Sequence, residues 1–68
     1  MGDNVYKTIE ITGSSTSSVE DAVTGAIAKA SETVRNLDWF EVTEIRGHIE
    51  DGSVAHYQVG LKIGFRLD

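Results

Sequence analysis

The sequence predicts an α+β domain with the element order β-α-β-β, in which one helix packs against a three-stranded antiparallel sheet. Three observations predict this fold: an alternating run near the N-terminus, an apolar stripe of helical period in the middle, and two alternating runs joined by Asp51-Gly52. The 68 residues have the length of one small domain, which we expect to span residues 1–68.

The first strand is expected at Val5–Thr12, where the side chains alternate between an apolar and a more polar face. Gly13–Thr16 is predicted to be a loop. Ser17 followed by Glu20 matches a capping box, so Ser17 is the predicted N-cap. The helix is then predicted to run to about Asn36, roughly 19 residues or about 29 Å. Its apolar stripe consists of Val19, Ala22, Val23, Ala26, Ile27, Ala30 and Val34.

Two long strands are expected at Trp39–Glu50 and Ser53–Leu67. Asp51-Gly52 between them is a strong hairpin signal, and we predict a three-residue loop with a bulge at Gly52. The last strand has one continuous apolar face, which favours the middle of the sheet. That face consists of Ala55, Tyr57, Val59, Leu61, Ile63, Phe65 and Leu67.

The second strand changes phase along its length. Phe40 and Val42 occupy even positions, whereas Ile45 and Ile49 occupy odd ones. A bulge between Val42 and Ile45 would place all four on one face of the sheet. The opposite face, away from the helix, would then carry Trp39, Glu41, Arg46 and His48.

Charge and composition exclude several classes of protein. The chain has 6 Lys and Arg against 11 Asp and Glu, a formal net charge of −5, and so lacks the basic face of a nucleic-acid binder. No apolar run approaches the ~20 residues that span a bilayer. Met1–Asn4 has no feature of a secretory signal. We therefore expect a cytoplasmic protein that binds neither nucleic acid nor membrane.

The chain has few means of stabilising itself alone. A domain of this size buries only about 60% of its unfolded surface. It has no cysteine for disulfides, and its two histidines are too few for a closed zinc site. Strands of ~12 residues would be about 40 Å long, longer than the ~29 Å helix that covers them. We therefore predict a closed homo-oligomer; the alternative is a curled monomer with a polar outer face.

Trp39, the single tryptophan, lies where the helical pattern ends and the strand pattern begins. In the predicted register Arg46 faces Gln58 on the same surface as Trp39. Gly60 and Gly64 on this surface leave room close to the backbone. An indole, a guanidinium and a primary amide suit a flat heteroaromatic ligand with donors and acceptors at its edge. The alternative is that Trp39 is a packing residue and Gln58 is merely solvated.

Three further residues near this surface have more than one interpretation. His48 faces His56 in the predicted register and is interpreted as half of a cross-strand pair, with pH sensing or phosphate binding as alternatives. Asp38 either contacts a ligand beside Trp39 or caps the entry to the strand. The sequence has no Ser-His-Asp set, phosphate loop or buried carboxylate pair. We therefore expect no catalysis, and the sequence assigns no residue as a metal ligand; whether a metal ion binds stays open.

Several short segments, taken together, are specific for one protein family, although each would be a weak signal alone. They are Val5-Tyr6-Lys7, Ile9-Glu10-Ile11, Leu37-Asp38-Trp39-Phe40-Glu41-Val42, Arg46-Gly47-His48, Asp51-Gly52, His56-Tyr57-Gln58-Val59 and Leu61-Lys62-Ile63-Gly64-Phe65-Arg66-Leu67. Through these segments the chain closely resembles the dodecin family over nearly its whole length.

The resemblance implies a sheet partly wrapped around its helix and assembly into a hollow homododecamer. It also implies that stacked flavin pairs lie at subunit contacts, sandwiched by symmetry-related tryptophans, for storage, buffering and photoprotection. Trp39 matches the stacking tryptophan, Gln58 the glutamine at the ring edge, and Arg46 the arginine of bacterial, FMN-type members. Asp38 is a weaker candidate beside them.

Two other functions stay open at this point. A purely structural or interaction module would use Trp39 only to pack subunits together. A carrier of another nucleotide-like ligand, such as coenzyme A at the outer surface, would bind FMN or riboflavin only incidentally.

Overall fold

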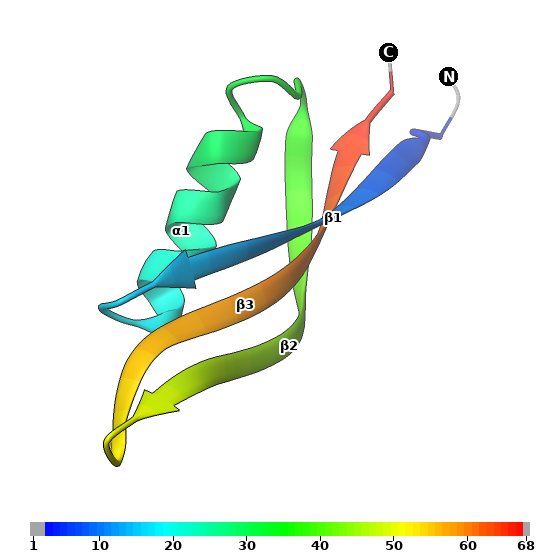
Figure 1. Ribbon diagram of the computed structural model, residues 1–68. Helices are drawn as coiled ribbons and strands as arrows, with labels where there is room; N and C mark the ends of the chain where they lie inside the picture. Colours follow the sequence, from blue (N-terminus) through cyan, green and yellow to red (C-terminus); the bar gives the residue numbers. More distant parts are fainter. Residues whose placement is uncertain (1–2, 68) are drawn as a thin grey trace.

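The computed structural model describes residues 3–67, so the predictions that rest on Met1 and Gly2, and the outer limits of the 1–68 domain, lie outside the described residues. The chain forms β1 (Tyr6–Ser15), α1 (Val19–Ala30), β2 (Leu37–Glu50) and β3 (Ser53–Arg66). β3 lies between β1 and β2 and pairs antiparallel with both (Figure 1). The predicted α+β fold, with the third strand in the middle, is confirmed.

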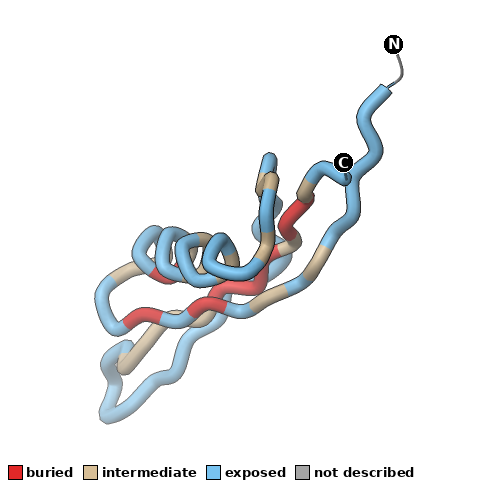
Figure 2. Tube along the Cα trace, turned by 90° about the horizontal axis from the view of Figure 1, so that it is seen from above, coloured by how far each residue is buried: buried red, intermediate tan, exposed pale blue. Residues whose placement is uncertain are grey.

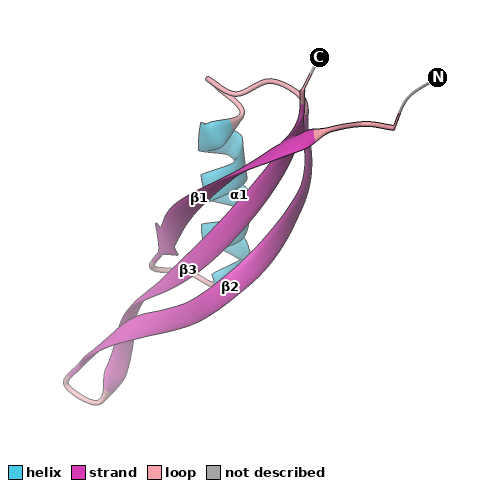
Figure 3. Ribbon diagram, turned by 90° about the vertical axis from the view of Figure 1, so that its right-hand side faces the viewer, coloured by secondary structure: helices cyan, strands magenta, loops and turns pink. Residues whose placement is uncertain are grey.

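The helix lies on one face of the sheet, over β1 and β3, and the strands curl beside it (Figure 3). Ala22 of α1 and three side chains of β3, Val59, Leu61 and Ile63, form the fully buried core. Figure 2 shows that the buried positions lie mainly on β3, with two on β1 and one on the helix. β2 is exposed almost throughout. The sheet is therefore only partly wrapped around its helix.

The helix begins one residue later than predicted. Ser18 is the N-cap, and its hydroxyl oxygen accepts a 2.9 Å hydrogen bond from the Asp21 backbone N–H. Ser17 instead donates its backbone N–H to Ser15 Oγ, and the Ser15 hydroxyl donates to the Asp21 carboxylate. The predicted capping box of Ser17 and Glu20 is therefore wrong, because Asp21 is the third helical residue and its carboxylate binds Ser15.

The helix ends at Ala30, well before the predicted end at Asn36. Ser31 is the C-cap, and the backbone N–H groups of Glu32 and Thr33 donate to carbonyls three residues back, which tightens the last turn. Asn36 adopts a left-handed conformation (φ 65°), which asparagine tolerates, and the chain enters β2. The 12-residue helix is only about 18 Å long, so it covers even less of the sheet than expected.

β1 continues through the predicted loop at Gly13–Thr16 as far as Ser15. A Cβ built on Gly13 would lie 2.3 Å from the Ala22 carbonyl oxygen and 2.8 Å from Ala26 Cβ. Because Gly13 has no side chain, the helix can approach β1 closely at this point. A glycine is therefore compatible with the strand here, although it predicted a loop. The other strand ends differ from the predicted ones by at most two residues.

We expect Gly13→Ala to destabilise the fold by about 1–3 kcal/mol, because the added methyl group must push the helix away from β1. Gly25→Ala on α1 is the matched control: nothing lies within 4 Å of the new Cβ, and an exposed helical alanine should stabilise the fold by roughly 0.5–1 kcal/mol. Thermal unfolding at equal protein concentration measures both variants. Equal melting temperatures for the two would contradict this role of Gly13.

β2 and β3 are joined by the two-residue turn Asp51-Gly52, whose φ angles of 52° and 77° are those of a type I′ hairpin turn. The predicted three-residue loop with a bulge at Gly52 is therefore wrong. The extra residue is Ala55, in the register shift next to the His48–His56 pair. Both arrangements place one unpaired residue between Glu50 and His56. The pairing from His48–His56 to Glu44–Gly60 is therefore the predicted one.

β2 contains the predicted bulge between Val42 and Ile45, with Thr43 as the extra residue, and a second bulge at Asp38. The two bulges keep the apolar residues on the side that faces the helix, which we call the helix-side face; on β2 it carries Phe40, Val42 and Ile45. We call the other side the open face; on β2 it carries Trp39, Glu41, Glu44, Arg46 and His48. The predicted set of residues on this face is thus confirmed, and Glu44 joins it.

A single chain does not complete its own core. Its radius of gyration is 14.3 Å, whereas a compact domain of this length has about 11 Å, and its extents are 57 × 20 × 13 Å. On the helix-side face of β2, Phe40, Val42 and Ile45 are 50%, 39% and 59% exposed. Apolar surface left open in this way is typical of chains that associate, which supports the predicted homo-oligomer.

Candidate functional site

The indole of Trp39 is seated on Gly64, its partner across the β2–β3 ladder. A Cβ built on Gly64 would lie 2.1 Å from Cε2 and 2.5 Å from Nε1 of the indole, so the ring occupies the space of the missing side chain. Tyr6 on β1 meets the indole edge-on, with ring centroids 6.5 Å apart at 64°. The indole is therefore held against the open face, and 41% of Trp39 stays exposed.

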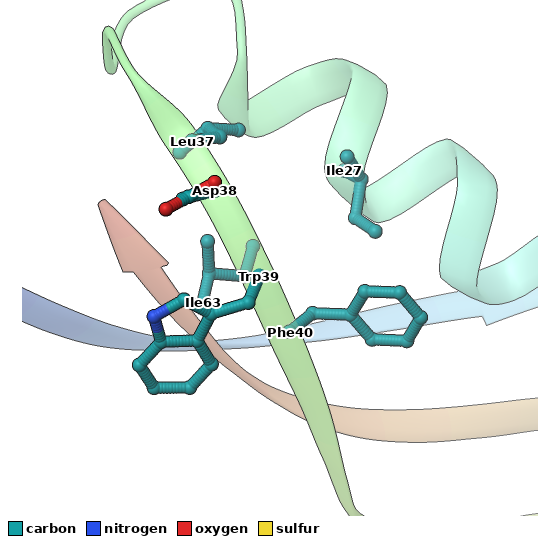
Figure 4. A pocket seen from close by; sticks show the side chains of 6 residues that line it. All are labelled: Ile27, Leu37, Asp38, Trp39, Phe40 and Ile63. Carbon is teal, nitrogen blue, oxygen red and sulfur yellow. The ribbon is translucent and has the colours of Figure 1, made fainter. Parts of the chain in front are cut away.

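A small hollow lies beside this ring, with a volume of about 110 Å³. In Figure 4 Trp39 and Phe40 project to opposite sides of β2, and Ile27 approaches from the helix. Asp38, the bulge residue, has no partner on β3 and lines the hollow next to the indole. Pockets that enclose small molecules have about 300–1,000 Å³, so this hollow does not enclose a large ligand within one chain.

Arg46 faces Gln58 across the ladder on the open face, as predicted. The Arg46 guanidinium donates through Nη2 to Oε1 of Glu44, and the two side chains are 55% and 58% exposed. Glu44 in turn lies over Gly60, where a built Cβ would be 2.9 Å from Glu44 Cγ. Arg46 is thus held by a carboxylate of its own strand.

The prediction of free space at Gly60 and Gly64 is wrong. Both glycines are buried, because Glu44 covers the first and Trp39 covers the second. Their missing side chains make room for side chains of the same chain, and not for a ligand near the backbone.

One chain does not bring the predicted site residues together. Trp39 pairs with Gly64 and Arg46 pairs with Gln58. These two positions are six residues apart along β3, a distance of about 20 Å at ~3.3 Å per residue. All three candidates share the open face, but a single ligand ring reaches both positions only if neighbouring copies supply them.

His48 and His56 form the predicted cross-strand pair, with stacked rings whose centroids are 5.6 Å apart at 22°. Nε2 of His48 also lies 3.7 Å from a carboxylate oxygen of Glu50.

Among the residues that the structure describes, no group of three or more His, Cys, Asp or Glu side chains is arranged to hold a metal ion. Within residues 3–67 no helix is long and apolar enough to cross a membrane.

Sequence reasoning missed Glu44 and the pairing of Gly64 with Trp39. The alternation of β3 placed Gly64 on the right face, but only the extra residue at Asp38 brings it opposite Trp39. Glu44 follows the Thr43 bulge directly, and the phase change located that bulge without identifying its extra residue.

The fold and sequence match known proteins closely. The family model for dodecin matches residues 5–68. A dodecin from Thermus thermophilus is 52% identical over 64 residues, which cover 94% of this chain and 93% of the relative. The solved structure of dodecin from Streptomyces coelicolor is 56% identical, with a TM-score of 0.93 over 100% of this chain and 97% of that chain.

A more distant solved structure is a calcium-chelating antigen from Mycobacterium tuberculosis, calcium dodecin, described with a calcium-binding site. It is 29% identical, with a TM-score of 0.80 over 94% of this chain and 91% of that chain.

Dodecins are small flavin-binding proteins that form homo-oligomers and catalyse no reaction, and their fold implies a dodecameric assembly. The expectation that this chain is not an enzyme is confirmed by that relationship. The family model matches nearly the whole chain, and two dodecins are more than 50% identical to it. The chain therefore belongs to the dodecin family.

Proposed function

We propose that this chain binds flavins without transforming them, as stacked pairs between tryptophans of symmetry-related copies, and so stores, buffers and photoprotects them. The observation that carries this proposal is the seat of Trp39. The indole lies against Gly64 and 41% of Trp39 stays exposed, so part of the ring is open to a second flat system.

Two-fold symmetry accounts for a pair of flavins. Where two copies meet across a two-fold axis, the same indole is presented twice. Two tricyclic rings then stack between the indoles, each in contact with one of them. The hollow of about 110 Å³ beside Trp39 is too small for a flavin, so the ligand belongs between chains.

We assign the remaining site residues to different copies of the chain. Arg46 and Gln58 are about 20 Å from Trp39 along one chain, so they would act on a flavin held by another copy's indole. Gln58 both donates and accepts, which matches the carbonyl and N–H edge of the ring. Arg46 would bind the phosphate of FMN and favour it over riboflavin. Asp38 would contact the ligand's side chain next to the indole.

The assembly that we propose is a hollow homododecamer in which residues 1–68 act as one flavin-binding domain. The family match over residues 5–68 supports a single domain. The exposed apolar residues of β2 support an assembly of copies. The cytoplasmic location stays a prediction from the sequence.

Titration of the ligand-free protein with FMN, followed by flavin fluorescence and by particle mass, tests the proposal. We expect strong quenching at a dodecameric mass, because an indole in contact with an excited flavin is placed to transfer an electron to it. Trp39→Ala should weaken binding by about ten- to a hundredfold, since aromatic stacking contributes roughly 1–3 kcal/mol per ring. Trp39→Phe, which keeps a flat ring, should lose less affinity.

The other two functions predict different results. A structural or interaction module would keep its assembled mass and leave FMN fluorescence unchanged. A carrier of a coenzyme A-like nucleotide would release bound flavin when that nucleotide is added. Trp39→Ala protein that binds and quenches FMN as well as the parent would refute the assignment of Trp39.

A further inference from the structure

Glu44 is a charged residue on the open face that the proposed function does not yet use. We infer that its carboxylate lowers the preference of this protein for phosphorylated flavins, by occupying Arg46 in the ligand-free state. This inference rests on the proposed function, in which Arg46 meets the FMN phosphate. It makes Glu44 a residue that determines specificity between FMN and riboflavin, although Glu44 itself need not touch the flavin ring.

The backbone fixes Glu44 beside Arg46. The bulge at Thr43 sets the register so that Glu44 faces Gly60. A Cβ built on Gly60 would lie 2.9 Å from Cγ and 3.4 Å from Oε1 of Glu44. The side chain therefore lies down on Gly60, in the space that any larger residue would fill. From this position Oε1 accepts the hydrogen bond from Nη2 of Arg46.

A phosphate that approaches Arg46 meets a guanidinium whose charge is already compensated. The phosphate must displace the Glu44 carboxylate or bind beside it, and in either case two anions share one cation. Riboflavin ends in a hydroxyl group and carries no such charge, so its affinity should not depend on Glu44. The two side chains are 55% and 58% exposed, so solvent screens the pair and the effect is modest.

Two further cations, Lys62 and Arg66, lie on the open face of β3. Lys62 lies on the same face, but Glu10 of β1 and Glu41 of β2 are its partners on either side. Lys62 is thus flanked by two acidic residues in the ladder, whereas Arg66 lies opposite Tyr6. Arg46 is the cation that donates a hydrogen bond to Glu44.

Glu44→Gln tests the inference in the full-length assembled protein. The amide keeps a hydrogen bond to the guanidinium but removes the charge. We expect FMN to bind about two- to fivefold more tightly at low ionic strength, the size of an exposed ion pair, and riboflavin to bind as in the parent. Glu41→Gln removes the same charge from the same face without a contact to Arg46, and is the matched control. In an Arg46→Gln background, Glu44→Gln should have no effect on FMN.

Each other result overturns the inference. An equal gain in Glu41→Gln would mean that only net charge matters. An equal gain for riboflavin, or unchanged or weaker FMN binding by Glu44→Gln, would exclude control of the phosphate by Glu44. A parent protein that binds neither flavin would refute the proposed function itself. A parent that binds both, with a ratio unmoved by Glu44→Gln, would refute only the role of Glu44.

Discussion

Gly64→Ala is expected to abolish most flavin binding while leaving Trp39 in the sequence. The new methyl carbon would lie 2.1 Å from Cε2 of the indole, whereas ordinary contact begins at 3.4 Å. The ring must therefore leave its seat by about 1 Å or more, or tilt away from the sheet. Because stacking requires parallel planes, we expect the flavin affinity to fall by at least about tenfold, approaching the effect of losing the ring.

Two measurements separate a displaced indole from a damaged fold. Near-ultraviolet circular dichroism and indole emission of the ligand-free protein should change in Gly64→Ala, while its particle mass stays that of the parent. Gly25→Ala adds the same methyl group where nothing lies within 4 Å. It should change neither the near-ultraviolet circular dichroism nor the indole emission. Parent-like flavin affinity in Gly64→Ala would show that the seat on Gly64 does not set the ring's orientation.

Ile45→Asp is expected to prevent assembly. Ile45 lies on the helix-side face of β2 and is 59% exposed in one chain, beyond the cover of α1. In the proposed assembly a neighbouring copy must cover it, and a buried carboxylate without a partner costs several kcal/mol at every such contact. We expect the assembled mass to disappear and the remaining chains to unfold or aggregate.

Native mass spectrometry and far-ultraviolet circular dichroism measure this loss. Ile45→Val, which keeps an apolar side chain at the same position, should retain both the assembled mass and the fold. If Ile45→Asp instead forms particles of parental mass and melting temperature, this face of β2 is not an interface between copies.

The phase change of β2 made its two faces predictable. Phe40 and Ile45 lie on one face only if the strand carries an extra residue between them, and the structure has that residue at Thr43. The same argument placed Trp39 and Arg46 together on the open face. Alternation is a strong signal there because each face has its own chemistry.

Alternation gave no warning of the second bulge. Leu37 and Trp39 are both large and apolar, so an extra residue between them leaves no break in the pattern. The seat of the indole on Gly64 depends on that shift of register at Asp38 and therefore could not be predicted.

The ends of the helix were misplaced for related reasons. Ser17 and Ser18 are adjacent and both able to cap, and the choice is made by Ser15, a residue of the preceding strand. Val34 continues the apolar stripe at helical spacing, although the helix has already ended at Ala30. Contacts with Ser15 of the preceding strand set the first boundary, and the tightened turn after Ser31 sets the second.

The uncovered strand has a consequence for the life of the protein in a cell. A chain whose interior is finished by its neighbours has a stability that depends on how many copies are present. Newly synthesised copies are therefore expected to reach full stability only after they meet, so stability should rise with expression level. A defective copy built into the shell would also weaken the healthy copies that it touches, so a mutant allele would act dominantly.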